Sequence, residues 1–341
     1  MLRIEYLEEE VPVYDITVKD NENFYANQIL VHNCGEIILR PNEFCNLSEV
    51  VVRESDDLGS LLRKVRIATT LGTWQSTLTN FKYISKKWQK NCEEERLLGV
   101  SLTGVMDNEM MSGRRGIDKL AFVLEKLRAA AREKNQELAA AIGINPSAAI
   151  TTQKPSGTVS QLVDSASGGH GRHSPYYVRN VRQDKKDPIG IFMKQMGFPC
   201  EDDVMKPDHT WVFSFPIKSP DASVFRDDLS AIEQLEIWKT YRNHWTDHNP
   251  SITVSVREGE WLEVGAWVYR NWNDACGISF LPHSDHIYRQ APYQECSKEE
   301  YERLLAKMPT DVDWRALADF EKEDNTEGAA TLACVSGTCE I

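Results

Sequence analysis

The sequence predicts an α/β protein with parallel strands, because helix-length apolar patterns alternate with short strand candidates along most of its 341 residues. Hydrophobic residues make up 41% of the chain and aromatic residues 9%, which is enough for a substantial core, and the length allows one large domain or two ordinary ones. No apolar run approaches the roughly 18 residues of a membrane span, and the first residues do not resemble a signal peptide. We therefore expect a cytoplasmic protein that does not contact a membrane.

Helices are predicted where apolar residues recur at helical spacing. The clearest helix covers about residues 118–142, where apolar side chains recur on one side and Gly143 provides a stop. Other helices are expected at about 57–71, 231–245, 260–274 and 297–308. The last of these opens with the capping box Ser297-x-x-Glu300.

Strand candidates separate these helices. A buried strand at 148–152 follows the longest helix, and further strands are expected at 211–215, 251–256 and 277–281. No internal repeat is visible. The stretch after Glu321 is polar and rich in small residues, so we expect a mobile tail there.

Charge and cysteine usage narrow the functional classes. A net charge of −13 argues against a general nucleic-acid-binding surface, so no direct nucleic-acid binding is expected. Eight irregularly spaced cysteines do not suggest a secreted disulfide scaffold and favour free thiols, metal ligands or catalytic redox pairs. Four of them have no motif around them and are interpreted as structural thiols: Cys92, Cys200, Cys276 and Cys296. The histidines are interpreted as loop or core residues, and no metal site is predicted.

The tripeptide His32-Asn33-Cys34 carries the groups that excise a peptide segment. The side-chain amide of Asn33 can cyclise onto the next peptide bond, His32 can donate a proton to that bond, and the Cys34 thiol can accept the acyl group. Residues 11–18 alternate like a strand, 20–23 form a polar turn, and 24–31 form a second apolar run. The flanks therefore predict a hairpin that presents a scissile junction.

This stretch resembles the C-terminal end of the intein family, with Asp15 at the position of a catalytic aspartate in those proteins. The resemblance makes residues 1–33 an intein C-terminal fragment of β type. About 33 residues cannot bury enough core to fold alone. We therefore expect a split intein, whose N-terminal fragment belongs to another chain.

Four motifs further along resemble the large catalytic subunit of ribonucleotide reductases: CGEI at Cys34, CNLSEV at Cys45, TTQKPSGTVSQL, and CVSGTC near the end. The segments GGHGRHSPYYVRNVR and GISFLPHSDHIYRQAPYQ resemble sequences of the monomeric, adenosylcobalamin-dependent (class II) ribonucleoside-triphosphate reductases. The resemblance covers residues 34–341. It implies the C-terminal part of a ten-stranded α/β barrel at 34–325, a flexible redox tail at 326–341, and adenosylcobalamin as the cofactor.

The resemblance assigns roles to three residues of the reaction. Cys34 is the thiyl residue that takes the 3′ hydrogen of the ribose. Glu36 lies two positions on, so in an extended loop it faces the same side as Cys34 and can take the 3′-OH proton. Cys45 supplies a reducing hydrogen and ends in a disulfide with a cysteine of the missing N-terminal half.

The Pro155-Ser156-Gly157-Thr158 turn follows the strand at 148–152 and precedes a short helical run, so it can present free N–H groups to a phosphate. The P-loop pattern GxxxxGK[ST] is absent. The resemblance makes Ser156, Gly157 and Thr158, with Pro155 in the turn, the site of the substrate phosphate. Ser160 is a candidate for an additional hydroxyl.

Cys334 and Cys339 lie five positions apart among glycine, serine and threonine. A zinc site would need two more ligands at short spacing, and the nearby sequence has none. A mobile dithiol is suited to exchange with an active-site disulfide and to reduction by thioredoxin or a similar donor.

Together these resemblances imply an enzyme that reduces ribonucleotides, as triphosphates, to 2′-deoxyribonucleotides for DNA synthesis. His32 stands where these reductases have asparagine, in NPCGEI. Excision of His32-Asn33 and joining to an N-terminal half that ends in Asn-Pro would restore that motif, so the chain is expected to act only after trans-splicing.

Two alternatives stay open. A class I ribonucleoside-diphosphate reductase would need an adjacent tyrosine pair late in the barrel. Tyr176-Tyr177 comes too early for that, and Tyr288 and Tyr293 are isolated in the sequence. The other alternative is an inert reductase fragment that retains only intein autoprocessing.

Overall fold

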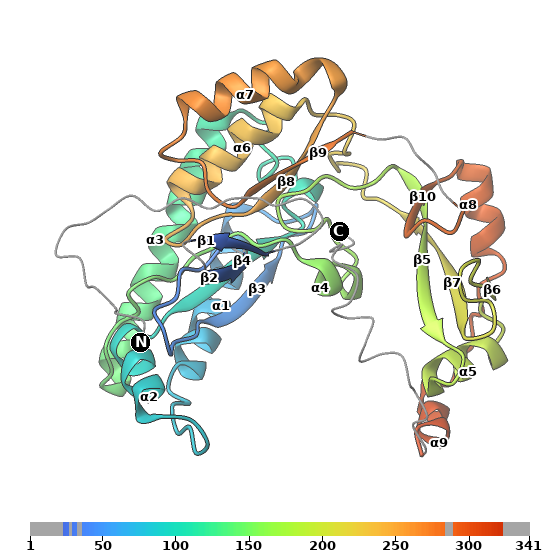
Figure 1. Cartoon of the computed structure of the whole chain (residues 1–341), viewed down its shortest axis with the longest axis horizontal. Helices are drawn as coiled ribbons and strands as arrows, with labels where there is room; N and C mark the ends of the chain where they lie inside the picture. The colour runs from blue at the N-terminus through green and yellow to red at the C-terminus, as the bar shows by residue number, and fades with distance from the viewer. Residues whose placement is uncertain (1–22, 27–28, 33–35, 284–288, 323–341) are drawn as a thin grey trace.

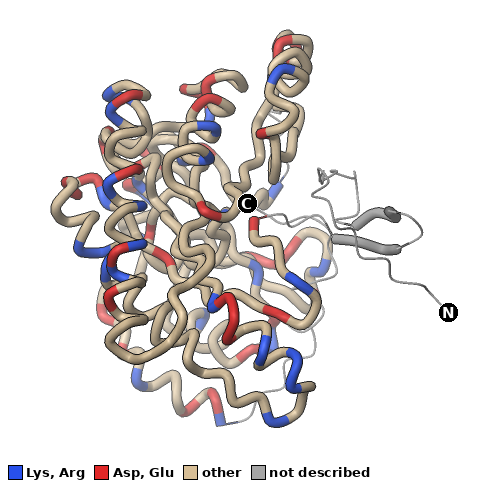
Figure 2. Tube along the Cα trace, turned by 90° about the vertical axis from the view of Figure 1, so that its left-hand side faces the viewer, with Lys and Arg blue, Asp and Glu red and all other residues tan. Residues whose placement is uncertain are grey.

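The computed structural model describes residues 23–26, 29–32, 36–283 and 289–322 (Figure 1). The sequence predictions for Asp15, Asn33, Cys34, Cys334 and Cys339 lie outside these residues, and His32 is described only by its backbone. Within the described ranges, none of the helices combines the length and apolar character needed to cross a membrane. Figure 2 shows acidic and basic residues interspersed along the described chain.

The helices are α1 (Leu58–Gln75), α2 (Lys86–Glu95), α3 (Ile117–Ile142), α4 (Gly157–Leu162), α5 (Pro188–Gln195), α6 (Ala231–His244), α7 (Trp261–Arg270), α8 (Lys298–Leu305) and α9 (Leu317–Phe320). Short 3₁₀ turns lie at Val105–Asp107, Glu258–Glu260 and Trp314–Ala316. The strands are β1 (Asn23–Ala26), β2 (Ile29–His32), β3 (Asn46–Val51), β4 (Leu98–Thr103), β5 (Tyr176–Asp184), β6 (Cys200–Asp202), β7 (Thr210–Lys218), β8 (Ile252–Val256), β9 (Ile278–Pro282) and β10 (Tyr293–Glu295).

Parallel strands form the centre of the fold, as predicted. β3 pairs with β4, and β8 pairs with β9, in parallel register. Parallel bridges from Val100 to Thr151 and from Gln153 to Pro250 join the two pairs through the chain around residues 150–153. The strand expected at 148–152 is therefore present as a short bridging segment. Five parallel segments thus follow one another in the order β3, β4, 150–153, β8, β9.

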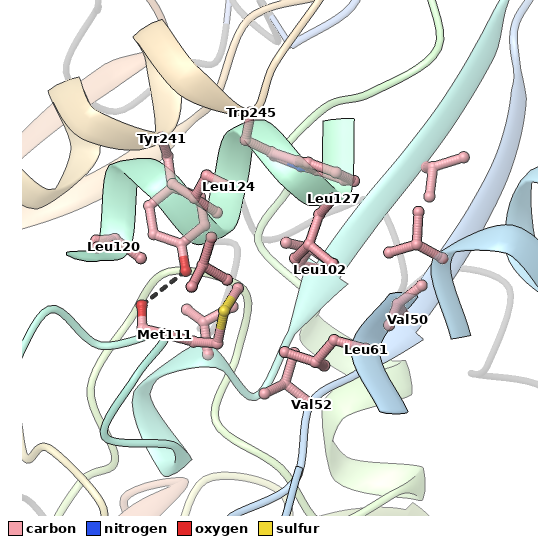
Figure 3. Packing of buried hydrophobic residues seen from close by; sticks show 14 of the residues in the cluster. Val50, Val52, Leu61, Leu102, Met111, Leu120, Leu124, Leu127, Tyr241 and Trp245 are labelled. Carbon is pink, nitrogen blue, oxygen red and sulfur yellow. Dashed lines mark hydrogen bonds between the residues drawn. The ribbon is translucent and has the colours of Figure 1, made fainter. Parts of the chain in front are cut away.

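Helices α1, α3 and α6 cover one side of these strands. Figure 3 shows Leu61, Leu102 and Leu127, from α1, β4 and α3, within one buried cluster. Each such side chain contributes about 1.5–3 kcal/mol on burial. Tyr241 of α6 donates its hydroxyl hydrogen to the Met111 carbonyl at 2.8 Å (Figure 3), and Trp245 donates its indole N–H to the Thr152 carbonyl at 2.8 Å. The first bond fixes α6 to the turn region after β4, and the second fixes the end of α6 to the 150–153 segment.

A four-stranded antiparallel sheet, in the order β10-β5-β7-β6, stands beside the parallel strands in Figure 1. Only part of β7 was expected from the sequence. β5 carries Arg179, Asn180 and Arg182 among its apolar residues, which obscures the alternation that marks a strand. Asn180 is buried because its side-chain amide donates to the Ala291 carbonyl at 2.7 Å.

Two local predictions are wrong. Residues 24–31 do not form one strand but contribute to two antiparallel strands, β1 and β2, in which Phe24 pairs with Val31. The expected capping box of α8 is only half formed. Ser297 Oγ accepts the Glu300 N–H at 3.1 Å. The Glu300 carboxylate accepts a hydrogen bond from Arg303 at 3.3 Å instead of the one from the Ser297 N–H that a capping box requires.

Candidate functional site

The side of the parallel strands opposite the helices carries polar residues. Successive residues of a strand point to opposite faces. Burial of Val50, Leu98 and Val254 against the helices therefore places three groups of residues on the other side, which we call the polar face: Glu49 of β3, Gly99 and Ser101 of β4, and Thr253 and Ser255 of β8.

Glu36 is held at the start of β8. Its carbonyl oxygen accepts the Asn249 N–H at 2.9 Å, and its Oε1 accepts the hydroxyl hydrogen of Ser251 at 2.9 Å. The residue is only 8% exposed. Glu36 is therefore not a solvated surface glutamate but a buried carboxylate with a fixed orientation, as a general base requires.

Cys45 lies over β4 on the polar face. A Cβ on Gly99 would meet Cys45 Sγ at 3.1 Å and Leu47 Cδ2 at 2.4 Å, so these two side chains pack closely over Gly99. Burial raises the pKa of the Cys45 thiol to about 12; the Glu43 charge adds to this effect and the Lys154 charge opposes it. The residue is a free, protonated thiol at neutral pH, and such a group retains a hydrogen to donate.

The predicted anion-binding turn lies where the sequence placed it, between the 150–153 segment and α4. Ser156 is 5% exposed, donates its backbone N–H to Ser167 Oγ at 2.9 Å, and donates its hydroxyl hydrogen to Glu49 Oε2 at 2.8 Å. A Cβ on Gly157 would have no heavy atom within 4 Å. The open part of the turn is therefore at Gly157 and Thr158, both of which are exposed.

The serine hydroxyls of this turn are engaged with the protein. Ser160 is fully buried, and its hydroxyl donates to the Ser156 carbonyl and, at 3.0 Å, to the Gly157 carbonyl. In this conformation the buried Ser160 hydroxyl stabilises the turn through hydrogen bonds to its backbone. The groups left for a phosphate are the backbone N–H groups of Gly157 and Thr158.

Glu49 is a site residue that the sequence analysis missed. It lies four positions after Cys45 and on the polar face. Burial raises its pKa, while the hydrogen bond from Ser156 and the charge of Lys154 lower it; the net shift is upward. The spacing of Cys45 and Glu49, which places both on one side of a strand, was the signal that could have identified it.

A buried ion pair, also missed, anchors the loop after α4. Arg172 binds Asp107 through two bonds, from Nε to Oδ1 at 2.9 Å and from Nη2 to Oδ2 at 3.0 Å, and donates to Asp164 at 2.8 Å. Asp107 also accepts from the Ser223 hydroxyl at 2.7 Å and the Ala166 N–H at 2.8 Å. These bonds satisfy both charges and connect the loop to the turn that follows β4.

A cavity of about 290 Å³ adjoins α4 and the polar face, with Ser165, His170 and Thr253 among its lining residues. The His173 ring stacks on Tyr293 with 5.6 Å between centroids and meets the edge of Tyr177 at 5.9 Å. Burial, with a contribution from Arg226, lowers the pKa of His173 to about 4, against an opposing effect of Asp227. The wall of the cavity therefore carries neutral aromatic rings.

Tyr293 is isolated in the sequence but not in the fold. Because β10 pairs with β5, the ring centroid of Tyr293 lies 5.8 Å from the ring centroid of Tyr177. Among the residues that the structure describes, no group of three or more His, Cys, Asp or Glu side chains is arranged to hold a metal ion.

No family model matches the chain. Over 341 aligned residues it is 26% identical to the adenosylcobalamin-dependent ribonucleoside-triphosphate reductase of Lactobacillus acidophilus, covering 90% of this chain and 44% of that protein. The reductase of the same name from Euglena gracilis is 26% identical over 310 residues, covering 89% of this chain and 41% of that protein. The chain thus spans less than half the length of these relatives.

A solved structure has the same arrangement of elements. The crystal structure of a B12-dependent (class II) ribonucleotide reductase matches with a TM-score of 0.71 and 22% sequence identity, covering 86% of this chain and 44% of the other. Over the part that it covers, the chain therefore has the α/β fold of a class II ribonucleotide reductase.

Proposed function

We propose that this chain is the C-terminal catalytic part of an adenosylcobalamin-dependent ribonucleotide reductase that acts on ribonucleoside triphosphates. The observation that carries the proposal is the polar face, where Glu36, Cys45 and the turn at 155–158 come together on one side of five parallel segments. The names of the curated relatives agree with this chemistry.

In the proposed reaction, a thiyl radical at Cys34 takes the 3′ hydrogen of the ribose, and Glu36 takes the 3′-OH proton. The 2′-hydroxyl then leaves as water. Cys45 and a cysteine of the missing half supply two electrons and two hydrogens and become a disulfide. Cys34 returns its hydrogen to the 3′ carbon, and Glu36 returns its proton to the 3′ oxygen. The protonated state of Cys45 supports its role as hydrogen donor.

Adenosylcobalamin, when bound, supplies the radical that this chemistry needs. The cavity beside α4 is lined by His173, Tyr177 and Tyr293, whose rings suit a heteroaromatic group such as an adenine. Its volume of about 290 Å³ is at the lower end of sites for drug-sized ligands and is too small for a whole corrinoid. This cavity therefore does not hold the whole cofactor, and we assign the remainder of the cobalamin site to the missing half.

Exposed apolar surface supports the need for an N-terminal half. β3 pairs only with β4 among the described strands, so its other edge has no strand partner there. Four large apolar residues of α1 and the turn after it form an exposed stripe, whose first two members line a hollow with β3: Ile67, Leu71, Trp74 and Leu78. We assign this edge and stripe to contacts with the missing half.

We further propose that this half is joined by trans-splicing at His32-Asn33-Cys34, with Asp15 assisting. The hairpin β1-β2 supports this, because its second strand ends at His32. After each turnover, Cys334 and Cys339 would pass electrons from thioredoxin, or a similar dithiol donor, to the active-site disulfide.

Mixing the chain with an N-terminal half that carries the complementary intein fragment tests the splicing step by intact mass. Asn33→Ala should stop release of the intein, because cyclisation needs the carboxamide. Cys34→Ala should stop ligation while still allowing cleavage after Asn33, and the control Cys92→Ala should splice normally. Normal ligation in either of the first two variants would refute the intein assignment.

A further inference from the structure

The loop that follows α4 packs directly on the proposed phosphate turn. Ser167 Oγ accepts the Ser156 N–H at 2.9 Å. Gly168 has a φ of +50°, and a Cβ there would meet the Lys154 carbonyl oxygen at 2.2 Å, so the two backbones touch. The Gly168 N–H donates to Thr103 Oγ1 at 3.0 Å. The position of Ser167 therefore determines where the Ser156 peptide lies.

His170 in turn determines the position of Ser167. The Thr253 N–H lies 2.9 Å from His170 Nε2, and because a backbone amide can only donate, Nε2 must accept. The hydrogen of the neutral ring is then on Nδ1, which donates to the Ser167 carbonyl at 3.1 Å, beside the backbone N–H of His170, which donates to the same carbonyl at 2.8 Å. Burial lowers the pKa of His170, which keeps this tautomer neutral. The imidazole thus connects β8 to the loop that holds Ser156.

We propose that His170 is a positioning residue for the substrate phosphate, which rests on the function proposed above. Through Ser167 it fixes the Ser156 peptide, so that the following N–H groups, at Gly157 and Thr158, remain available for the phosphate. No described residue accepts a hydrogen bond from those two groups. Loss of the contact between His170 and Ser167 weakens phosphate binding and leaves the radical chemistry at Glu36 and Cys45 intact.

Two substitutions, made in the joined enzyme, each remove one of the two hydrogen bonds of the His170 imidazole. His170→Asn keeps a donor near the Nδ1 position, so it retains the bond to Ser167 and loses the one from Thr253. His170→Gln keeps an acceptor near the Nε2 position, so it loses the side-chain bond to Ser167 and keeps only the one from the backbone N–H. We expect His170→Gln to raise the KM for a ribonucleoside triphosphate about tenfold, the scale of one lost hydrogen bond, with kcat within about twofold. His170→Asn should raise KM as well, because the connection between β8 and the loop needs both hydrogen bonds of the imidazole.

Ser167→Ala removes the acceptor for the Ser156 N–H and should reproduce the effect of His170→Gln even if a histidine variant fails to fold. His244→Gln is the matched control, because His244 is bonded to Glu125 at 2.8 Å on α3, away from the turn. His244→Gln should change neither the KM nor the kcat of the joined enzyme. KM values near that of the wild type for both histidine variants, or a fall in kcat without a change in KM, would overturn the proposal.

Binding of inorganic tripolyphosphate to the joined enzyme, measured by calorimetry, tests the inference without turnover. Its Kd should rise by the same factor as KM in His170→Gln and Ser167→Ala. If the joined wild-type enzyme makes no deoxynucleotide, the proposed function fails. If it makes deoxynucleotide but tripolyphosphate binds the wild type and both variants equally, only the role of His170 fails.

Discussion

Ser251 donates its hydroxyl hydrogen to Glu36 Oε1 at 2.9 Å, although the two residues are 215 positions apart in the chain. A hydrogen bond to a charged group contributes about 1.5–3 kcal/mol. Since Ser251 immediately precedes β8, this bond fixes the carboxylate relative to the parallel strands. Glu36 therefore depends on the fold of the whole described chain for its orientation.

Ser251→Ala should lower kcat of the joined enzyme about 10- to 100-fold, because a misplaced base loses alignment with the proton it takes. Glu36→Gln, which removes the base, should lower it by about 10²–10⁴. Ser219→Ala is a suitable control, because that buried hydroxyl donates to the Ser174 carbonyl at 2.8 Å, at the start of the antiparallel sheet. Steady-state kinetics that show equal losses for Ser251→Ala and Ser219→Ala would argue against a special role for Ser251.

Gly168→Ala should weaken both stability and substrate binding. Its φ of +50° disfavours a side chain, and the new Cβ would clash with the Lys154 carbonyl next to the phosphate turn. Gly197→Ala is the matched control, with a φ of +84° but no atom within 4 Å, and should cost only about 1–2 kcal/mol for the backbone conformation. Denaturant unfolding should show a larger loss for Gly168→Ala, and only that variant should raise KM.

His173 makes stability depend on pH. The folded-state pKa is about 4, lower than the unfolded value of about 6.5, so the unfolded chain binds the proton first as the pH falls. The contribution of His173 to stability is therefore complete above about pH 6.5 and is lost progressively toward pH 4. His173→Phe keeps the ring between Tyr177 and Tyr293 and should flatten the dependence of the unfolding midpoint over this interval. If the unfolding midpoint of His173→Phe depends on pH as steeply as that of the wild type, His173 is not the cause of the dependence.

The proposed redox role of the tail can be separated from a structural one. Replacing Cys334 and Cys339 with serine should leave a first turnover intact, because the reduced Cys45 pair can act once. Multiple turnovers with thioredoxin should stop, while dithiothreitol should restore them by reaching the disulfide directly. Normal cycling of the double variant with thioredoxin alone would exclude the shuttle.

Local sequence signals predicted the elements with strong periodicity or clear ends. α3 ends at Gly143, whose φ of +72° is the left-handed cap conformation that the sequence indicated. α1 begins after Asp57, whose side chain accepts the Ser60 N–H at 2.7 Å. The turn before α4 was also found, because its residues lie next to one another in the chain.

Contacts between distant segments could not be predicted in the same way. Ser156 and Glu49 are 107 positions apart, and nothing local to either indicates the other. The ion pair between Asp107 and Arg172 is buried only because the turn after β4 meets the loop after α4. Polar residues that find partners in the folded protein, such as Asn180 of β5, also remove the alternation on which strand prediction depends.

The most direct test of the account is ribonucleotide reduction by the joined protein. The chain is spliced to its N-terminal half, supplied with adenosylcobalamin, dithiothreitol and a ribonucleoside triphosphate, and the 2′-deoxy product is measured. We predict product from the joined protein without a second radical-generating protein, none from either half alone, and none from Cys34→Ser. Absence of product from the correctly joined protein, or product only when such a second protein is added, would contradict the account.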